Sequence, residues 1–176
     1  MHPAFCNMLE ELTACTEGVS KDTAQIHPAH DETRWSIQQV IEHLVMTYRS
    51  TCGILQSRLE KGRPLFTKPT MRQRTMQLFV TRFGYFPKDI PAPSAVMPAH
   101  ANLPPMGGND LLQALQQDLE TMELLIEKCR AQFGERRVAT HIILGPLTAE
   151  QWIQFHGVHG RHHGKQLRRI RASIAA

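Results

Sequence analysis

Apolar residues recur at helical spacing in four long segments of the chain: residues 3–18, 36–62, 109–133 and 148–174. In each segment they fall at intervals of three and four, which places them on one face of a helix. No segment shows a convincing strand pattern of alternating polar and apolar residues. The pattern therefore predicts an all-α protein, a four-helix bundle in which the apolar faces meet.

Two of the predicted helices begin with the same capping signal. Ser36 is followed three residues later by Gln39, and Thr148 is followed three residues later by Gln151. In each pair a hydroxyl and an amide side chain can form a capping box at the start of a helix. The other predicted boundaries are Asn109 as the cap of the third helix and Gly134 as its end.

The segment between the second and third long helices contains too many prolines to form one helix. Residues 71–83 have the spacing of a short helix, and six prolines follow Gly84 within residues 84–108. Prolines lower the entropy that a loop loses when it becomes ordered. We expect a long proline-rich crossover that covers one end of the bundle. Residues 19–35 are expected to be mostly connection.

The length and composition suit a single domain spanning residues 1–176. Hydrophobic residues make up 41% of the chain, and no run of 18 apolar residues could span a membrane. The N-terminus lacks the basic and then apolar layout of a signal peptide. Four cysteines are scattered without a CxxC pair, so disulfides are not expected, and Cys52 and Cys129 fall at predicted core positions. These features predict a cytoplasmic protein.

The net charge of +4 permits an anionic partner without requiring one. On a helical projection, basic residues of the last helix gather on its outward side. No aromatic residues are interleaved with them for base stacking, so the pattern disfavours nucleic acid and indicates a solvated face. The basic residues are Arg161, Lys165, Arg168, Arg169 and Arg171.

Histidines interrupt the apolar face of the last helix. His159 and His163 are four residues apart, so their imidazoles lie one turn apart on the same side of the helix. That side also carries Trp152 and Ile170, which indicates that both rings point toward the core. Two interpretations remain open at this point: a shared metal ion, or a pair of hydrogen-bonded core histidines.

A complete metal site needs a ligand from another helix, because two imidazoles alone are too few. His43, at the edge of the apolar face of the second helix, is the natural candidate, although such a histidine can also face solvent. The HExxH motif of metalloproteases is absent, because Gly160 follows His159. Gly157, Gly160 and Gly164 lie beside the histidine face and indicate close approach of a neighbouring helix or ligand.

Three passages of the sequence resemble the DinB-like superfamily of metal-binding four-helix bundles. Residues 35–44 resemble the family's second-helix segment, which ends near its first histidine ligand. Residues 145–152, with the pattern GPLTxEqW, resemble the start of the last helix in one uncharacterised branch. Residues 159–166 resemble the family's HxxHHxxQ segment. The likeness covers nearly the whole chain in helix order.

The resemblance implies that His43, His159 and His163 form a three-histidine metal site. His162 would then point elsewhere, and His156 would be a spare histidine one turn earlier on the same face. The order Gly164-Lys165 departs from the Arg-Gly order common in the family, so no role is carried over to that arginine.

Similar proteins include thiol-dependent S-transferases and a maleylpyruvate isomerase that use mycothiol or bacillithiol. The resemblance thus implies an open metal position that activates a thiol or water toward a small-molecule substrate, in a thiol S-transferase or a hydrolase. The metal would be zinc or nickel, with iron or copper as alternatives. A homodimer fits the family. Two other readings stay open: a non-catalytic metal or small-molecule binding bundle, and an interaction module that uses the basic face.

Overall fold

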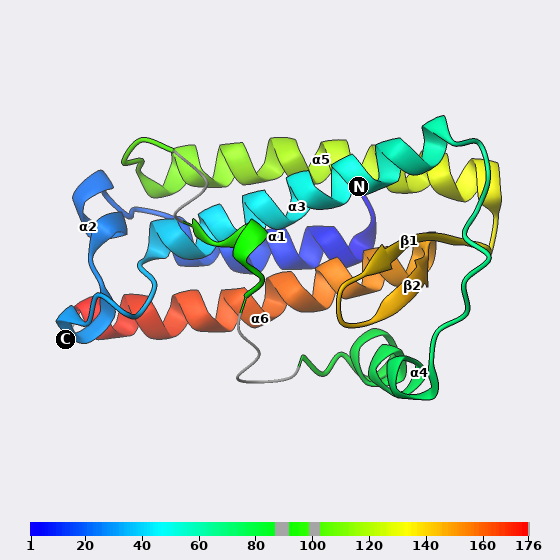
Figure 1. The fold of residues 1–176 in the computed structure, drawn as a ribbon. Helices are drawn as coiled ribbons and strands as arrows, with labels where there is room; N and C mark the ends of the chain where they lie inside the picture. Colours follow the sequence, from blue (N-terminus) through cyan, green and yellow to red (C-terminus); the bar gives the residue numbers. More distant parts are fainter. Residues whose placement is uncertain (87–91, 99–102, 176) are drawn as a thin grey trace.

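The computed structural model describes residues 1–86, 92–98 and 103–175, and its main feature is a bundle of four long helices (Figure 1). This arrangement confirms the predicted all-α fold class. None of the described helices is both long and apolar enough to cross a membrane. The four helices are α1 (Pro3–Thr16), α3 (Ile37–Glu60), α5 (Gly108–Phe133) and α6 (Ala149–Ala175).

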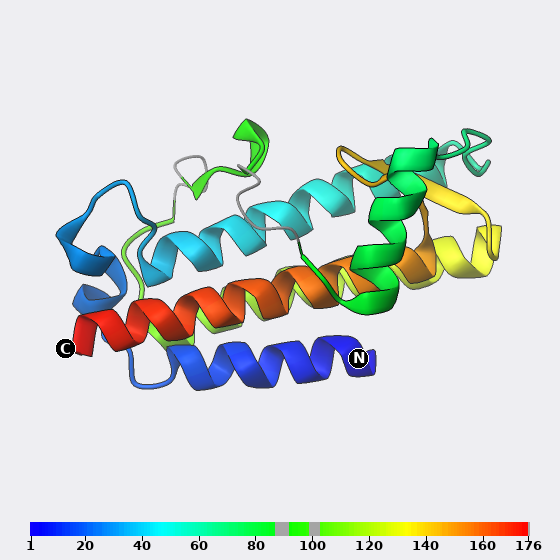
Figure 2. The same ribbon diagram turned by 90° about the horizontal axis from the view of Figure 1, so that it is seen from below.

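The helices pack as two neighbouring pairs, α3 with α5 and α1 with α6. Helices α3 and α5 run in the same direction, as the colour gradients of Figures 1 and 2 show. Two parallel helices cannot be joined by a short turn, so the chain must return along the length of the bundle between them. The structure confirms the long crossover between the second and third long helices. The parallel direction of α3 and α5 makes this crossover necessary.

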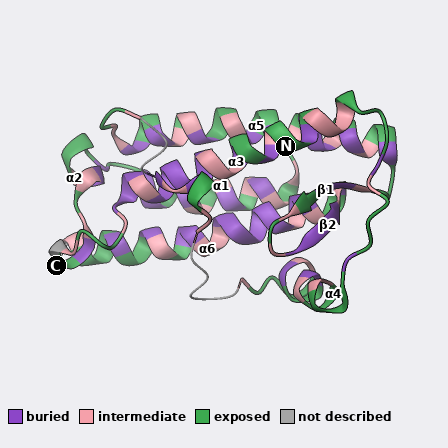
Figure 3. Cartoon of the chain, in the orientation of Figure 1, coloured by how far each residue is buried: buried purple, intermediate pink, exposed green. Residues whose placement is uncertain are grey.

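The core lies between the apolar faces of these four helices, and exposed residues occupy their outer sides (Figure 3). Burial of large apolar side chains is the main source of the bundle's stability. The largest fully buried side chains include Trp152, Tyr48, Phe5, Met8 and Leu12. Among the cysteines expected in the core, Cys129 is buried and Cys52 is half-buried.

Short elements decorate one side and both ends of the bundle. They are α2 (Lys21–Gln25), η1 (Pro28–His30), α4 (Met71–Gln77), the π-helical turn η2 (Leu78–Arg82), η3 (Ser94–Val96), and the strands β1 (Arg137–His141) and β2 (Gly145–Thr148). The predicted short helix over residues 71–83 is confirmed as α4 and η2. The segment 19–35, expected to be mostly connection, contains α2.

The hairpin formed by β1 and β2 contradicts the expectation that the chain has no strand. The two strands pair antiparallel, with Ala139 opposite Leu147 and His141 opposite Gly145, and they pair mainly with each other. Their burial follows no alternating pattern, and β2 contains Gly145 and Pro146, residue types that are rare in strands. Strands this short, held by packing against α4 and α6, leave no period in the sequence.

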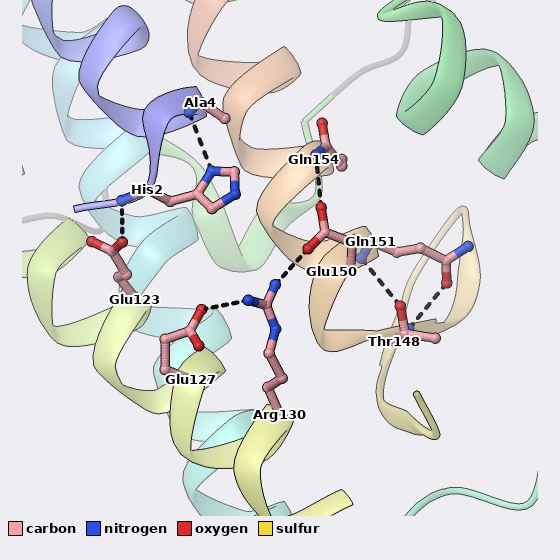
Figure 4. Close-up of polar contacts among 9 residues, drawn as sticks. All are labelled: His2, Ala4, Glu123, Glu127, Arg130, Thr148, Glu150, Gln151 and Gln154. Atoms are coloured by element: carbon pink, nitrogen blue, oxygen red, sulfur yellow. Dashed lines mark hydrogen bonds and ion pairs between the residues drawn. The ribbon is translucent and has the colours of Figure 1, made fainter. Parts of the chain in front are cut away.

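The start of α6 is fixed by the predicted capping box. The Thr148 hydroxyl accepts from the Gln151 backbone N–H at 3.2 Å, and the Gln151 side chain accepts from the Thr148 N–H at 3.0 Å (Figure 4). Arg130 of α5 pairs with Glu150 in the first turn of α6. The capping box at Ser36 and Gln39 is confirmed too. These contacts set where the histidine-bearing helix begins.

The start of α5 differs from the prediction by two residues. Its N-cap is Gly107 rather than Asn109, and Gly108 is its first residue. A side chain at Gly108 would overlap the backbone carbonyl of Thr16, so the helix can begin there only with glycine. Close packing of α5 on the end of α1, rather than the capping residue, sets this boundary. Gly134 ends α5 as predicted, with φ +59°.

The described parts of the crossover lie along the side of the bundle, not over one end as expected (Figure 2). The Gln38 side chain of α3 donates to the Pro104 carbonyl and accepts from the Met106 N–H. Earlier in the crossover, η3 packs against α3. Residues 87–91 and 99–102, which the prediction also included, lie outside the described residues. The crossover therefore covers the flank of α3 that faces α6.

The glycines of α6 let α1 approach closely, which confirms the predicted close contact with a neighbouring helix. A Cβ atom on Gly160 would overlap the Sδ and Cγ atoms of Met8, and one on Gly164 would crowd Glu11. Met8 is fully buried and cannot move aside into solvent. The glycines thus allow α6 to lie against α1 on one side while its histidines face α3 on another.

We expect Gly160→Ala to lower the free energy of unfolding by about 1–3 kcal/mol, because the added methyl group overpacks a closed contact. Gly53→Ala is the matched control. Gly53 lies inside α3 with no atom near the position of a Cβ, so alanine there should stabilise by about 1 kcal/mol through helix propensity. Urea denaturation of both variants measures the difference. Equal stabilisation by the two substitutions would show that α1 and α6 are not in close contact.

Candidate metal centre

The structure brings the three predicted ligands together, although His43 lies more than a hundred residues from the other two in the sequence. One nitrogen from each of His43, His159 and His163 lies within 4.8 Å of the others. The Nε2 atom of His159 is 3.3 Å from that of His43 and 3.0 Å from that of His163. Two nitrogens bound to one tetrahedral metal ion by bonds of about 2.1 Å lie about 3.4 Å apart, so these separations fit a shared ion.

The outer ring nitrogens show how two of the three imidazoles are oriented. His43 Nδ1 donates to the Val96 carbonyl at 2.8 Å, and His163 Nδ1 donates to the Gln166 side-chain oxygen at 2.8 Å. A carbonyl oxygen can only accept, so both Nδ1 atoms carry the proton. The Nε2 atoms of these two rings therefore present lone pairs to the centre. Metal-binding histidines are commonly held by such outer hydrogen bonds.

This arrangement leaves too few protons for the three converging nitrogens. His159 Nδ1 is buried and has no hydrogen-bond partner among the described residues. If His159 carried its proton on Nε2, it could donate to only one of its two neighbours, and the lone pair of the other would have no donor. A cation at the centre would satisfy all three nitrogens at once. The donor set therefore fits a metal ion.

Apolar burial keeps these imidazoles neutral. His43, His159 and His163 are each less than a tenth exposed. Burial lowers the pKa of His163 to about 3 and that of His159 well below its usual range, and it also lowers the pKa of His43. The Phe155 ring stacks on His159 with centroids 5.4 Å apart, and Trp35 lies 5.0 Å from His43. Neutral imidazole is the form that binds metal.

The three histidines border a cavity of about 1070 Å³. Its walls come from α3, α6, η3 and the β1–β2 hairpin, and it is lined largely by apolar groups that include Trp35, Phe86 and Phe155. A cavity of this size can hold a small molecule beside the histidines. The site therefore combines a histidine cluster that could hold a metal ion with space for a small molecule.

The basic side of α6 is exposed as predicted at Lys165, Arg168, Arg169 and Arg171, and only Arg161 departs from that prediction. Arg161 is half-buried, and it lines the cavity together with Lys165 and Arg169. The helical projection of the last helix considered only packing within the bundle core. In the structure, η2 and the crossover pack on the other flank of α6, so that flank forms part of the cavity wall. His162, expected to point elsewhere, stays out of the histidine cluster but also lines the cavity, beside Phe86 at 4.8 Å.

His156, the spare histidine, lies outside the cluster. Its Nε2 atom is 3.1 Å from the Thr51 hydroxyl, and its ring stacks on Trp152. It is fully buried, one helical turn before His159. A hydrogen bond to a core hydroxyl explains its presence, so only two of the four histidines in residues 156–163 face the convergence point.

Comparison with known proteins agrees with this geometry. The profile of the DinB superfamily matches residues 5–167, nearly the whole chain. The chain belongs to the DinB superfamily. A relative, the uncharacterized protein YuaE of Bacillus subtilis (strain 168), is 26% identical over 158 residues, which are 90% of this chain and 89% of YuaE. No solved structure gave a significant match.

Within this DinB-superfamily site, three contributions were missed by sequence reasoning. Val96 acts through its backbone carbonyl, which no side-chain pattern can reveal. Gln166 is the last residue of the HxxHHxxQ segment but was given no role, although its spacing of three residues from His163 is the signal for a contact on a helix. His141 lines the cavity from the hairpin, an element that the sequence did not predict.

The metal-free protein should lose stability as the pH falls below about 6.5, the pKa of an unperturbed histidine. Burial lowers the pKa of His156 to about 3 and that of His141 to about 4. Between these values and 6.5 the unfolded chain binds more protons than the folded chain, so acid favours unfolding. The stability is complete above about pH 6.5 and declines toward pH 4.

Replacing one buried histidine tests the source of this pH dependence. His156→Gln keeps a polar group that can reach Thr51 but cannot titrate. In urea denaturation with a chelator present, its free energy of unfolding should depend less steeply on pH near pH 5, by about 1.4 kcal/mol per pH unit. An unchanged slope would mean that His156 does not take up a proton when the protein unfolds.

Proposed function

We propose that this DinB-superfamily chain is a metal-dependent enzyme whose divalent metal ion is held by His43, His159 and His163. The observation that carries the proposal is the convergence of three Nε2 atoms at the edge of a cavity, two of them with lone pairs fixed by outer hydrogen bonds. Three protein ligands leave a position for a substrate or water, which is the pattern of catalytic rather than structural metal sites.

The bound ion would act as a Lewis acid that lowers the pKa of a thiol or a water molecule at its open position. The protein itself orients the ligand rings and excludes water from the site. Val96 and Gln166 fix the rotation of two ligand rings. Phe155 and Phe86 flank His159 and keep bulk water away from it. This supports a thiol S-transferase, with a low-molecular-weight thiol as co-substrate, or a hydrolase acting on a small molecule.

Imidazole ligands favour borderline metals. We expect zinc or nickel, and iron or copper can bind the same three nitrogens. No carboxylate takes part in the cluster of described residues, which disfavours magnesium and calcium because those ions prefer oxygen ligands.

One observation favours the alternative of a non-catalytic metal-binding or small-molecule-binding bundle. No aspartate or glutamate is among the described residues that line the cavity. A general base would therefore have to be an imidazole, Lys165, Tyr85 or the metal-bound group itself. Thiol-conjugation and esterase assays of the metal-loaded protein separate an enzyme from a binding protein.

Metal content tests the proposal at its base. Tag-free wild-type protein should contain roughly one ion per chain, and His43→Ala or His159→Ala should lose it, because two imidazoles hold a metal poorly. His162→Ala is the matched control, since His162 lines the same cavity but is not in the cluster. Elemental analysis gives the content. A metal-free wild type, or equal loss in the His162 variant, would contradict the proposed ligand set.

The outer hydrogen bond to His163 should matter for affinity but not for the existence of the site. Gln166→Ala removes the acceptor of the Nδ1 proton and should weaken metal binding by about 10- to 100-fold. Gln154→Ala, on the exposed side of the same helix, should leave the affinity unchanged. Competition with a chromophoric chelator measures both. Identical affinities in the two variants would show that Gln166 does not orient His163.

A further inference from the structure

His141 lies in the wall of the cavity, one aromatic ring away from the histidine cluster. Its ring centroid is 4.4 Å from that of Phe155, and Phe155 stacks on His159 at 5.4 Å. The distance from His141 to His159 is therefore no more than the sum of these two. A small molecule can span that gap while one of its ends occupies the metal position.

The tautomer of His141 is fixed by the hairpin turn. Its Nδ1 atom accepts from the backbone N–H groups of Ile143 and Leu144, each at 3.1 Å. A nitrogen that accepts two N–H groups cannot carry a proton, so the proton of the neutral ring is on Nε2. In His141, Nε2 is thus always the donor, because the turn keeps Nδ1 as the acceptor.

The Nε2–H group of His141 has no partner among the described residues. A turn cap accounts for Nδ1 alone and leaves the second nitrogen on the cavity side unexplained. The Nε2 atom is not among the buried side-chain atoms that lack a partner, so water can reach it, and a ligand oxygen can take the place of that water. This nitrogen is therefore available to whatever occupies the cavity.

The hairpin holds this donor rigidly. The Gln77 side chain donates to the carbonyl oxygens of Leu144 and Pro146, at 2.8 and 3.1 Å. Gly145, with φ +72°, lies so close to Gln73 that a Cβ atom there would overlap the glutamine side chain. Contacts from α4 thus lock the turn that orients His141. A donor held in place in advance loses little entropy when it binds a ligand.

The charge of the cavity selects the kind of oxygen that would be bound. Four cationic side chains line it, and the described lining contains no acidic side chain to balance them. Three of these cations are exposed and screened by solvent, whereas Arg161 is half-buried and is screened less. A carboxylate that accepts from the His141 ring would be attracted by this cation, whereas an ammonium group would be repelled. The four are Arg34, Arg161, Lys165 and Arg169.

We propose that His141 is a substrate-binding residue whose Nε2–H donates a hydrogen bond to a carboxylate of the substrate. The substrate class is a small carboxylate-bearing molecule whose other end carries the group that reaches the metal. This inference rests on the proposed metal site for that second end. It assigns to the hairpin the role of selecting the substrate.

Two substitutions separate the functions of the two ring nitrogens. His141→Asn places an amide oxygen near the position of Nδ1, so it preserves the turn cap and removes the Nε2 donor. His141→Gln places an amide nitrogen near the position of Nε2, so it preserves a donor and weakens the cap. Arg161→Gln removes one cation and leaves His141 intact.

Zinc-loaded protein is titrated calorimetrically with mercaptohexanoate and with hexanethiol, which share the metal-binding thiol and differ in the carboxylate. Wild type should prefer mercaptohexanoate. His141→Asn should reduce this preference about tenfold, the effect of one hydrogen bond to a charged group, and His141→Gln should retain it. Nitrogen-15 NMR of the histidines should show His141 as the Nε2–H tautomer, with its signal shifted by mercaptohexanoate and not by hexanethiol.

The outcomes that overturn the inference differ from those that overturn the metal site. Zinc binding with equal affinity for the two probes, or an unchanged preference in His141→Asn, removes the role of His141 alone. Equal loss in the Asn and Gln variants assigns the effect to hairpin shape, and loss only in Arg161→Gln assigns it to the cations, so both overturn the donor role. A wild-type chain that takes up no zinc overturns the metal site and this inference together.

Discussion

Three neutral imidazoles meet in the core, two of them with their lone pairs turned toward the third, and the surrounding structure maintains this arrangement. His43 is held through its outer nitrogen by Val96, and His163 is held by Gln166. Without an ion, His159 can donate to only one of its neighbours, so at least one lone pair stays without a donor in a buried, largely apolar environment. A bound cation would give the Nε2 atom of each of the three histidines a partner. The cluster thus makes sense chemically as a site for a cation.

Other contacts in the fold place α3 beside α6 at the histidine cluster. Glycines allow α6 to lie close to α1, and this contact sets its position beside α3. The crossover, which the parallel direction of α3 and α5 requires, passes over the same flank and supplies the Val96 carbonyl. A connection that topology makes necessary therefore also becomes part of the site, and it encloses the cavity next to the histidines.

The sequence predicted the elements that depend on a regular period and the residues that belong to a helix face. The capping boxes at Ser36 and Thr148 and the four long helices were predicted from such patterns. The meeting of His43 with His159 was implied by the family resemblance, because the pattern alone left His43 at the edge of its helix face. The hairpin was not predicted, because short strands with Gly145 and Pro146 carry no alternating pattern. The projection also placed Arg161 in solvent, since a helical period shows which residues share a face but not which segments cover that face.

A crystal structure of the zinc-loaded protein with anomalous scattering measured at the zinc edge tests the central claim most directly. The account predicts one strong anomalous peak at about 2.0–2.1 Å from the Nε2 atoms of His43, His159 and His163. It also predicts that the Nδ1 atoms of His43 and His163 keep their bonds to Val96 and Gln166. A peak bound through other atoms, or no peak between these three rings, would contradict it.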